Sequence, residues 1–306
     1  MQTIFVIEQL LNGMGYGFML FLLAAGLTLV FGIMDTMNLA HGSLFMVGGY
    51  MAATVHTRSD SFAAAVLGGV AATVLVALVL EALLMRRLYG RDHLAQVLAT
   101  FGVILILDDA VKALWGPAPI MAPPPAALGE PVTLLPGLPY PSYRLLILAA
   151  GLVIAAGLYL LVNRTRIGML VRAGASNRGM AELMGVRVDR VFTLVFLLGA
   201  ALAAVAGALM GPISAVQIGM GESILIPALV VIVIGGIGSV RGVFVASMLV
   251  GVVDTAGRAF LPPALRAVLP PAVAADLGPA LTSIAVYALM VAVLAFKPAG
   301  LFPARA

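Results

Sequence analysis

Runs of apolar residues long enough to cross a lipid bilayer recur along this 306-residue chain and leave little room for soluble structure. Hydrophobic residues make up 62% of the sequence and charged residues only 10%, whereas soluble domains average about 25% charged residues. A helical span needs about 20 apolar residues, and its backbone polar groups must be satisfied internally. The sequence therefore predicts an all-α polytopic transmembrane bundle of about eight or nine membrane segments, with residues 1–306 forming one domain.

Nine apolar segments are separated by charged, glycine-rich or proline-rich stretches. They cover residues 9–34, 44–55, 62–85, 93–115, 144–162, 191–210, 223–234, 243–260 and 280–296. The second segment, 44–55, is too short for a straight crossing, so we expect a broken or partly re-entrant helix. Proline disrupts helix interiors, so residues 116–143 are predicted to form an ordered external loop. Residues 258–279, with proline pairs at 262 and 270, are expected to form another.

Basic residues are concentrated in residues 164–190, which contain six arginines and two acidic residues. This stretch accounts for the whole net charge of +4, and the rest of the chain is balanced. Positively charged loops between membrane spans face the cytoplasm. With nine segments, the N-terminus would then lie on the periplasmic side and the C-terminus in the cytoplasm.

A short helix is predicted inside this cytoplasmic stretch. Ser176 or Asn177 can cap its N-terminus, because a short polar side chain accepts from free backbone amides. Gly185 suits the position after its last turn, where glycine adopts a left-handed backbone at little cost. The helix is too short to cross a bilayer or to be stable alone.

The side chains of this helix offer one ion pair and one apolar face. Arg178 and Glu182 are four residues apart and can pair, whereas Met180, Leu183 and Met184 share a face. An apolar face on a short cytoplasmic helix indicates docking into a partner groove. The alternative is a loop that lies on anionic lipid headgroups.

A polar break at residues 35–43 interrupts the first two apolar segments. We expect Asn38, His41, Gly42 and Ser43 to line or border a translocation path, because polar groups at membrane depth need protein or water partners. His41 is the strongest polar candidate. It could be a pathway or gating residue, or a structural histidine satisfied by neighbouring backbone groups.

A second break, GGIGSVRG at residues 235–242, lies in the other half of the chain. Gly235, Gly236, Gly238 and Gly242 are predicted to form a tight structural turn with backbone freedom and close packing. Paired interrupted segments indicate a pathway at a pseudo-symmetric interface. The turn does not complete a dinucleotide-binding fingerprint, and no strand is predicted before it.

No catalytic, cofactor-binding or metal-binding pattern is found in the sequence, so we expect no enzyme and no cofactor. Cysteines are absent, and the chain lacks a P-loop and would not itself hydrolyse ATP. The basic surplus beside the membrane indicates lipid contact and no nucleic acid. Two alternative functions remain: a proton-coupled secondary transporter that uses Asp108, Asp109, Asp254 and His41, and an intramembrane enzyme that uses His41.

Three blocks together resemble the branched-chain amino acid (Liv-type) ABC transporter permeases of the bacterial inner membrane. They are GLTLVFGIMDTMNLAHGSLFMVGGYMAA at 26–53, RAGASNRGMAELMGVRVDRVFTLVFLLGAALAAVAGAL at 172–209 and VIGGIGSVRGVFVASMLVGVVD at 233–254. The resemblance implies half of an importer, completed by a second permease chain or copy, two cytoplasmic ATP-binding subunits and a periplasmic solute-binding protein. It also implies that the helix at 176–185 couples to an ATPase. Other members carry urea or short amides, so the substrate stays open.

Overall fold

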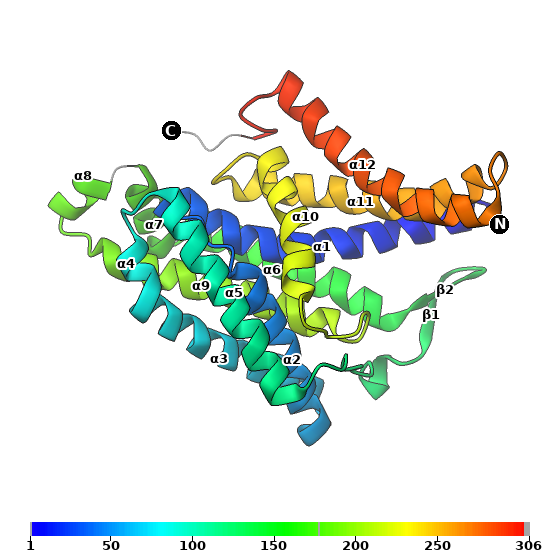
Figure 1. Cartoon of the computed structure of the whole chain (residues 1–306), viewed down its shortest axis with the longest axis horizontal. Coiled ribbons are helices and arrows are strands. Elements are labelled where there is room, and N and C mark those ends of the chain that lie inside the picture. Colours follow the sequence, from blue (N-terminus) through cyan, green and yellow to red (C-terminus); the bar gives the residue numbers. More distant parts are fainter. Residues whose placement is uncertain (1, 177, 303–306) are drawn as a thin grey trace.

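The chain folds almost entirely into helices, which pack side by side into an elongated bundle (Figure 1). The computed structural model describes residues 2–176 and 178–302. The helices are α1 (Gln2–Met34), α2 (His41–Ser59), α3 (Phe62–Leu80), η1 (Glu81–Met85), α4 (Arg86–Leu88), α5 (His93–Trp115), η2 (Ala126–Leu128), α6 (Ser142–Arg164), α7 (Arg166–Ser176), α8 (Arg178–Leu183), α9 (Val188–Met210), α10 (Met220–Gly235), α11 (Val240–Leu265) and α12 (Pro271–Phe296).

Seven helices in the described part of the chain are long and apolar enough to cross a membrane. They are α1, α3 with its extension to Leu88, α5, α6, α9, α11 and α12. The other two apolar segments expected from the sequence form α2 and the shorter α10. The expectation of an all-α polytopic bundle is thus confirmed.

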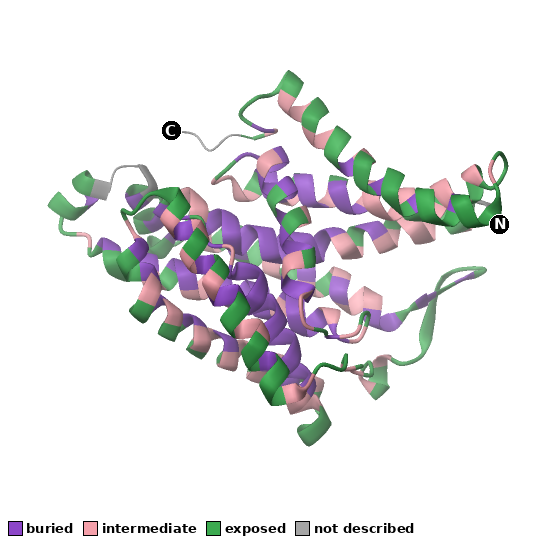
Figure 2. Ribbon diagram, viewed as in Figure 1, coloured by how far each residue is buried: buried purple, intermediate pink, exposed green. Residues whose placement is uncertain are grey.

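Helices α1 and α9 form the centre of the bundle (Figure 2). Of the most apolar stretch of α1, 78% is buried, against 11% for α12. The central helices pack through large side chains, and the rings of Phe21 in α1 and Phe244 in α11 meet edge to face at 5.3 Å. The outer helices α3, α6 and α12 leave most of their apolar surface uncovered, as expected for helices that face lipid or a partner chain.

The first break is shorter than expected, and the helix after it is longer. Helix α2 begins at His41, so that His41, Gly42 and Ser43 form its first turn, and it continues to Ser59 rather than residue 55. The irregular chain is confined to residues 35–40. The added last turn, residues 56–59, is polar and largely exposed, whereas the first turn of α2 is buried.

The prediction of an outer loop at residues 258–279 is wrong. Helix α11 continues to Leu265 with Pro262 and Pro263 inside its last turn, and α12 begins at Pro271. Proline is accepted in the first turn of a helix, where its missing N–H has no helical partner. Pro262 and Pro263 lack the amides that would bond the Arg258 and Ala259 carbonyls, so they weaken α11 only near its end.

The proline-rich residues 116–143 form a loop with a small hairpin, apart from the start of α6 at Ser142. Strands β1 (Pro131–Leu135) and β2 (Leu138–Pro141) are antiparallel, and Val132 lies opposite Tyr140. Earlier in the loop, Ile120 and Val216 exchange two backbone hydrogen bonds of 2.9 Å. This bridge ties the loop to the connection between α9 and α10.

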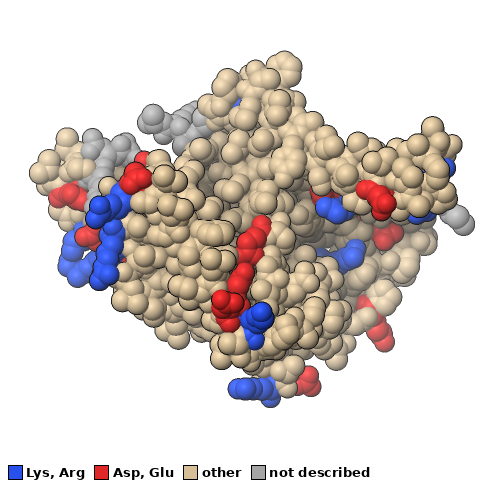
Figure 3. Space-filling model, viewed as in Figure 1, with Lys and Arg blue, Asp and Glu red and all other residues tan. Residues whose placement is uncertain are grey.

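The two ends of the bundle differ in charge. Basic side chains gather around α4, α7 and α8 at the left of Figure 3, whereas the N-terminus and the hairpin lie at the opposite end (Figure 1). The sequence patterns did not predict α7. It follows α6 closely because Gly168 packs against the Val162 carbonyl, where a Cβ would lie only 2.2 Å from that oxygen.

Candidate functional site: the broken helix and the cytoplasmic segment

The break between α1 and α2 is held by polar side chains of α5. Asp35 ends α1 with a left-handed backbone (φ 48°). The Met37 amide donates to Gln96 Oε1 at 2.9 Å, and the Leu39 amide donates to Thr100 Oγ1 at 3.2 Å. These bonds satisfy backbone groups that have no helical partner, as membrane depth requires.

Gln96 and Thr100 were missed by reasoning from the sequence. Both are buried, and Gln96 Nε2 also donates to the carbonyls of Leu88 at 3.3 Å and Arg91 at 3.1 Å. One amide therefore joins the break to the chain that enters α5. Their signal was present, because two polar residues four apart in an apolar span share one helix face.

The His41 side chain is enclosed between three helices. It is 1% exposed, and its Nε2 lies 3.2 Å from the Leu23 carbonyl oxygen of α1. Glycines make room for the ring, since a Cβ on Gly26 would lie 2.9 Å from Nε2 and one on Gly199 would lie 3.4 Å from Cε1. The imidazole thus packs where α1, α2 and α9 meet.

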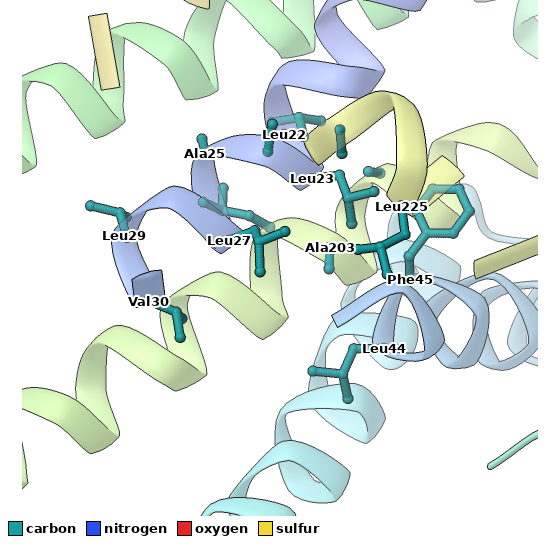
Figure 4. Packing of buried hydrophobic residues seen from close by; sticks show 14 of the residues in the cluster. Leu22, Leu23, Ala25, Leu27, Leu29, Val30, Leu44, Phe45, Ala203 and Leu225 are labelled. Atoms are coloured by element: carbon teal, nitrogen blue, oxygen red, sulfur yellow. The ribbon is translucent and has the colours of Figure 1, made fainter. Parts of the chain in front are cut away.

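Helices α2 and α10 cross with their backbones in contact. A Cβ on Gly42 would lie 2.4 Å from the Gly221 carbonyl oxygen, and the reverse distance is also 2.4 Å. Figure 4 shows the surrounding apolar packing, with Leu44 and Phe45 of α2 and Leu225 of α10. The crossing brings the first turn of α2 against the first turn of α10.

Asn38 and Ser43 lie on either side of His41 and are also buried. Within the described residues, neither the Asn38 amide nor the Ser43 hydroxyl has a hydrogen-bond partner. A buried polar group without a partner costs about 1–3 kcal/mol. The four residues expected at the path therefore gather at the start of α2, and two of them retain unused polar groups.

The glycine turn joins the end of α10 to the start of α11. Gly236 and Gly238 have φ of 99° and 79°, a region that favours glycine. A Cβ on Gly242 would lie 1.9 Å from the Gly235 carbonyl oxygen, and one on Gly32 of α1 would lie 2.4 Å from the Gly238 Cα. The turn is therefore a point of close backbone packing between α1, α10 and α11.

Helix α8 is the short cytoplasmic helix expected at residues 176–185, with its regular part at Arg178–Leu183. Gly185 has φ 84°. Its amide donates to the Glu182 carbonyl, and the Val186 amide donates to the Ala181 carbonyl, both at 3.0 Å. This pair of bonds is the Schellman arrangement that closes a helix C-terminus. Asn177 and the side chains of Ser176 and Arg178 lie outside the described part, so the cap and ion pair expected there are not placed.

The apolar side chains of α8 point away from the bundle. Leu183 is 83% exposed, Met184 78% and Met180 57%, whereas Ala181 on the opposite side is buried. An element of six residues holds little structure by itself. Its surface is thus both apolar and largely uncovered by this chain.

A buried carboxylate lies where the cytoplasmic segment meets the membrane helices. Glu81, fully buried in the π-turn η1, accepts from Arg86 Nε at 3.0 Å and from Thr193 Oγ1 at 2.8 Å. Tyr89 packs edge to face on Phe192, and burial together with Glu81 raises the pKa of its phenol. The network joins the end of α3 to the start of α9. Glu81 was missed by reasoning from the sequence, although a carboxylate within an apolar span is itself a signal.

The residues considered for proton transport lie on three different helices. Asp254 forms a two-bond pair with Arg258 one turn later in α11, at 2.8 and 3.1 Å. Asp108 and Asp109 lie in α5, and His41 lies at the start of α2. Asp254 is thus neutralised locally.

Comparison with known proteins agrees with this architecture. Residues 9–294 match the family model described as "Branched-chain amino acid transport system / permease component". The chain is 29% identical to the high-affinity branched-chain amino acid transport system permease protein BraD of Pseudomonas aeruginosa, over 96% of this chain and 95% of BraD. It is 28% identical to LivH of Salmonella typhimurium and 26% identical to LivH of Escherichia coli K12, each over 85% of this chain and 88% of the relative.

The family model spans both the broken helix and the cytoplasmic segment, and the relatives align along most of their own length. The resemblance seen in the three sequence blocks is therefore confirmed. This chain belongs to the family of branched-chain amino acid transport system permease components.

Proposed function

We propose that this chain forms half of the translocation path of an ABC importer for branched-chain or related amino acids. It would pair with a second permease chain, or a second copy, in the bacterial inner membrane. Two ATP-binding subunits would bind on the cytoplasmic side, and a solute-binding protein would deliver substrate from the periplasm. These assignments rest on the family and on the polarity of the bundle.

The observation that carries the coupling role is the uncovered apolar face of α8. Leu183 and Met184 project at the basic end of the molecule, where the positive-inside rule places the cytoplasm. Beside them, a hollow of about 550 Å³ opens between α4 and the α8–α9 turn, lined by Arg86, Tyr89 and residues 186–190. A short helix with such a face fits a groove on an ATPase.

The geometry at the start of α2 supports a role for its polar residues beside the translocation path. Asn38 and Ser43 keep unused polar groups at membrane depth, which is a feature of functional positions. His41 would act as a positioning residue, since its ring is held in packing with α1 and α9. The path itself would run between the two permease chains.

The test is reconstitution of the complete importer with variants at Leu183. Leu183→Asp places a charge in an apolar contact, which costs several kcal/mol when the charge is buried without a partner. We expect loss of the ATPase subunits on purification and loss of ATP-driven leucine uptake. Insertion and pairing with the second permease should persist, because Leu183 does not contribute to the bundle interior.

Leu183→Lys separates ATPase docking from attachment to lipid headgroups. A buried lysine should damage an apolar groove as aspartate does, whereas anionic headgroups would tolerate or prefer it. Ile237→Asp, at an exposed site in the α10–α11 turn, controls for an added acid elsewhere. Full ATPase retention by both Leu183 variants would exclude α8 as the coupling element. Uptake by the chain alone, driven by a pH gradient, would favour the secondary transporter.

A further inference from the structure

The face by which α3 packs on its neighbours includes a carboxylate. Buried side chains recur at every fourth position along α3 and η1, a spacing that places them on one face of the helix. They are Ala65, Gly69, Thr73, Ala77, Glu81 and Met85. An ionisable side chain at membrane depth is costly and is a candidate functional group, so packing alone does not account for Glu81.

One oxygen atom of Glu81 joins η1, α4 and α9. Glu81 Oε1 accepts from Arg86 Nε in α4 at 3.0 Å and from Thr193 Oγ1 in α9 at 2.8 Å. Arg86 Nη2 also donates to Thr193 Oγ1, at 3.3 Å. The second oxygen, Oε2, is buried and has no hydrogen-bond partner among the described residues. The polar contact between the end of α3 and the start of α9 is therefore centred on a single oxygen.

The Thr193 hydroxyl has a second acceptor within its own helix. Its Oγ1 lies 3.0 Å from the Asp189 carbonyl oxygen, one turn earlier in α9. A hydroxyl has one proton to donate, so a full bond goes either to Glu81 or to Asp189. If the start of α9 moved away from α3, Thr193 would keep the Asp189 carbonyl and Glu81 would keep Arg86. The contact can thus open without leaving a buried charge or a hydroxyl unpaired.

The surroundings of this contact leave room for movement. Arg86 and Tyr89 line one side of the hollow of about 550 Å³, and residues 186–190 between α8 and α9 line another. Glu81 begins a π-turn, a widened helical turn that often occurs at functional sites. Helix α8 is tied to the same segment, since the Val186 amide donates to the Ala181 carbonyl at 3.0 Å. A displacement of α8 would therefore reach the start of α9.

We propose that Glu81 and Thr193 form a separable joint, which opens and closes during transport and relays the movement of α8 to α3. Both are positioning residues, because they act on transport through the helices that they hold together. This inference rests on the coupling role proposed for α8. It adds the contact through which a movement of the ATPase subunits reaches the membrane helices.

The first test measures coupling in the complete reconstituted importer. Thr193→Val keeps the shape of the side chain and removes the hydroxyl, so the joint cannot form. Leucine uptake per ATP hydrolysed should fall about 10-fold, the loss expected for a hydrogen bond to a charged group. Thr193→Ser, which restores the hydroxyl, should recover the wild-type ratio. The amount of assembled complex should stay the same, since Thr193 is only partly buried.

Thr57→Val is the matched control. Thr57 is exposed in the last turn of α2, and its hydroxyl donates to the Thr54 carbonyl of the same helix at 2.9 Å. This variant should couple like wild type. A wild-type ratio in Thr193→Val, or the same fall in both valine variants, would overturn the proposal. So would a parallel fall of uptake and ATP hydrolysis, which indicates a loss of folded protein alone.

Glu81→Ala tests whether the two residues act through one contact. It should lower the ratio as Thr193→Val does, and Arg86 keeps its charge in water because its side chain is 55% exposed. The double variant should be no worse than either single variant, since the second change removes a contact that is already lost. Effects that multiply in the double variant would show that Glu81 and Thr193 act separately, against the joint.

The second test observes the joint without transport. Leu83→Cys in η1 and Leu194→Cys in α9 replace exposed side chains on its two sides, and the chain has no native cysteine. With cysteine-free ATPase subunits, electron spin resonance gives the distance between spin labels at these positions. This distance should differ between the nucleotide-free and the vanadate-trapped complex, and Thr193→Val should show the longer distance in both. An unchanged distance in the wild type would overturn the proposal.

The two tests separate this inference from the proposed function. An importer that does not carry leucine would contradict the proposed substrate, but the spin-label distance requires only ATP and still decides the joint. Full coupling of ATP hydrolysis to leucine uptake without a change in this distance would retain the proposed function and reject the joint.

Discussion

At the α2–α10 crossing the backbones of Gly42 and Gly221 touch and their apolar neighbours are enclosed, whereas on α8 Leu183 and Met184 project from the molecule. Both places correspond to short segments that interrupt the surrounding composition: a polar break in an apolar stretch, and an apolar helix face in a basic stretch. The crossing is completed by contacts within this chain. The α8 surface is not completed by contacts within this chain, since its apolar side chains have large exposed areas.

This difference predicts where a substitution will act. A change at the crossing alters contacts between helices of one chain, so the free energy of folding should fall first. A change on α8 leaves these contacts intact, so the free energy of association with a partner should fall. Comparing the thermal stability of the permease with its retention of ATPase subunits separates the two effects.

The largest effect is expected for Gly42→Val. The new Cβ would lie 2.4 Å from the Gly221 carbonyl oxygen, a backbone atom that moves only if α2 and α10 separate. Overpacking of an interior costs about 1–3 kcal/mol or more, and two helices must shift here. We expect little folded protein in membranes, measured as the monodisperse fraction after detergent extraction.

Gly102→Val is the control for Gly42→Val. Gly102 lies in α5, and a Cβ there would meet nothing within 4 Å. Valine is tolerated in a helix at a cost below about 1 kcal/mol relative to alanine, so this variant should fold. Comparable yields from the two variants would mean that the α2–α10 contact is looser than its geometry indicates.

An intermediate effect is expected for His41→Ala. The substitution removes the contact with the Leu23 carbonyl and leaves a cavity between α1, α2 and α9. Loss of a buried hydrogen bond and of buried volume together cost about 2–4 kcal/mol. The melting temperature of the complex and leucine uptake should both fall.

His41→Gln tests whether the imidazole itself is needed. Glutamine retains a donor that can reach toward Leu23, so we expect stability and uptake to recover together. A His41→Gln variant with wild-type stability but no uptake would place the imidazole in the translocation path. That result would change the comparison with α8, because the start of α2 would then serve transport as well as the packing of the bundle.

The smallest effect is expected for Gly185→Ala at the end of α8. A left-handed backbone costs a non-glycine residue about 1–2 kcal/mol, and Gly185 has φ 84°. We expect a shift in ATPase affinity of about 5- to 30-fold and no change in the melting temperature of the isolated permease. Gly174→Ala in α7 is the control, since a Cβ there has open space. Equal effects of both changes would show that the Schellman turn does not matter for docking.

Much of the fold could be predicted because it depends on length and polarity. Apolar segments, the proline-rich loop and the basic end follow from the bilayer thickness, the chemistry of proline and the distribution of arginine. The prediction of a second outer loop, at residues 258–279, was wrong for a related reason. Pro271 opens α12 and Pro262 lies near the end of α11, and proline counts alone do not distinguish a helix end from a loop.

The candidate site could be predicted only in part. The stretch at 35–43 and the helix at 176–185 were found because they interrupt the surrounding composition. Gln96, Thr100 and Glu81 were missed, since the contacts that give them a role at the site come from groups 59 to 112 positions away in the chain. The structural role of each of these side chains depends on which helix lies opposite it.

The sequence by itself determined that this chain is a helical membrane protein of a permease family, because hydrophobic length and local motifs are properties of neighbouring residues. Only the tertiary structure decided that His41 lies against Leu23 and that Gly42 meets Gly221. These pairs are separated by 18 to 179 positions in the chain. Contacts at such separations arise from helix packing, whose geometry is set by side-chain volumes across several helices at once.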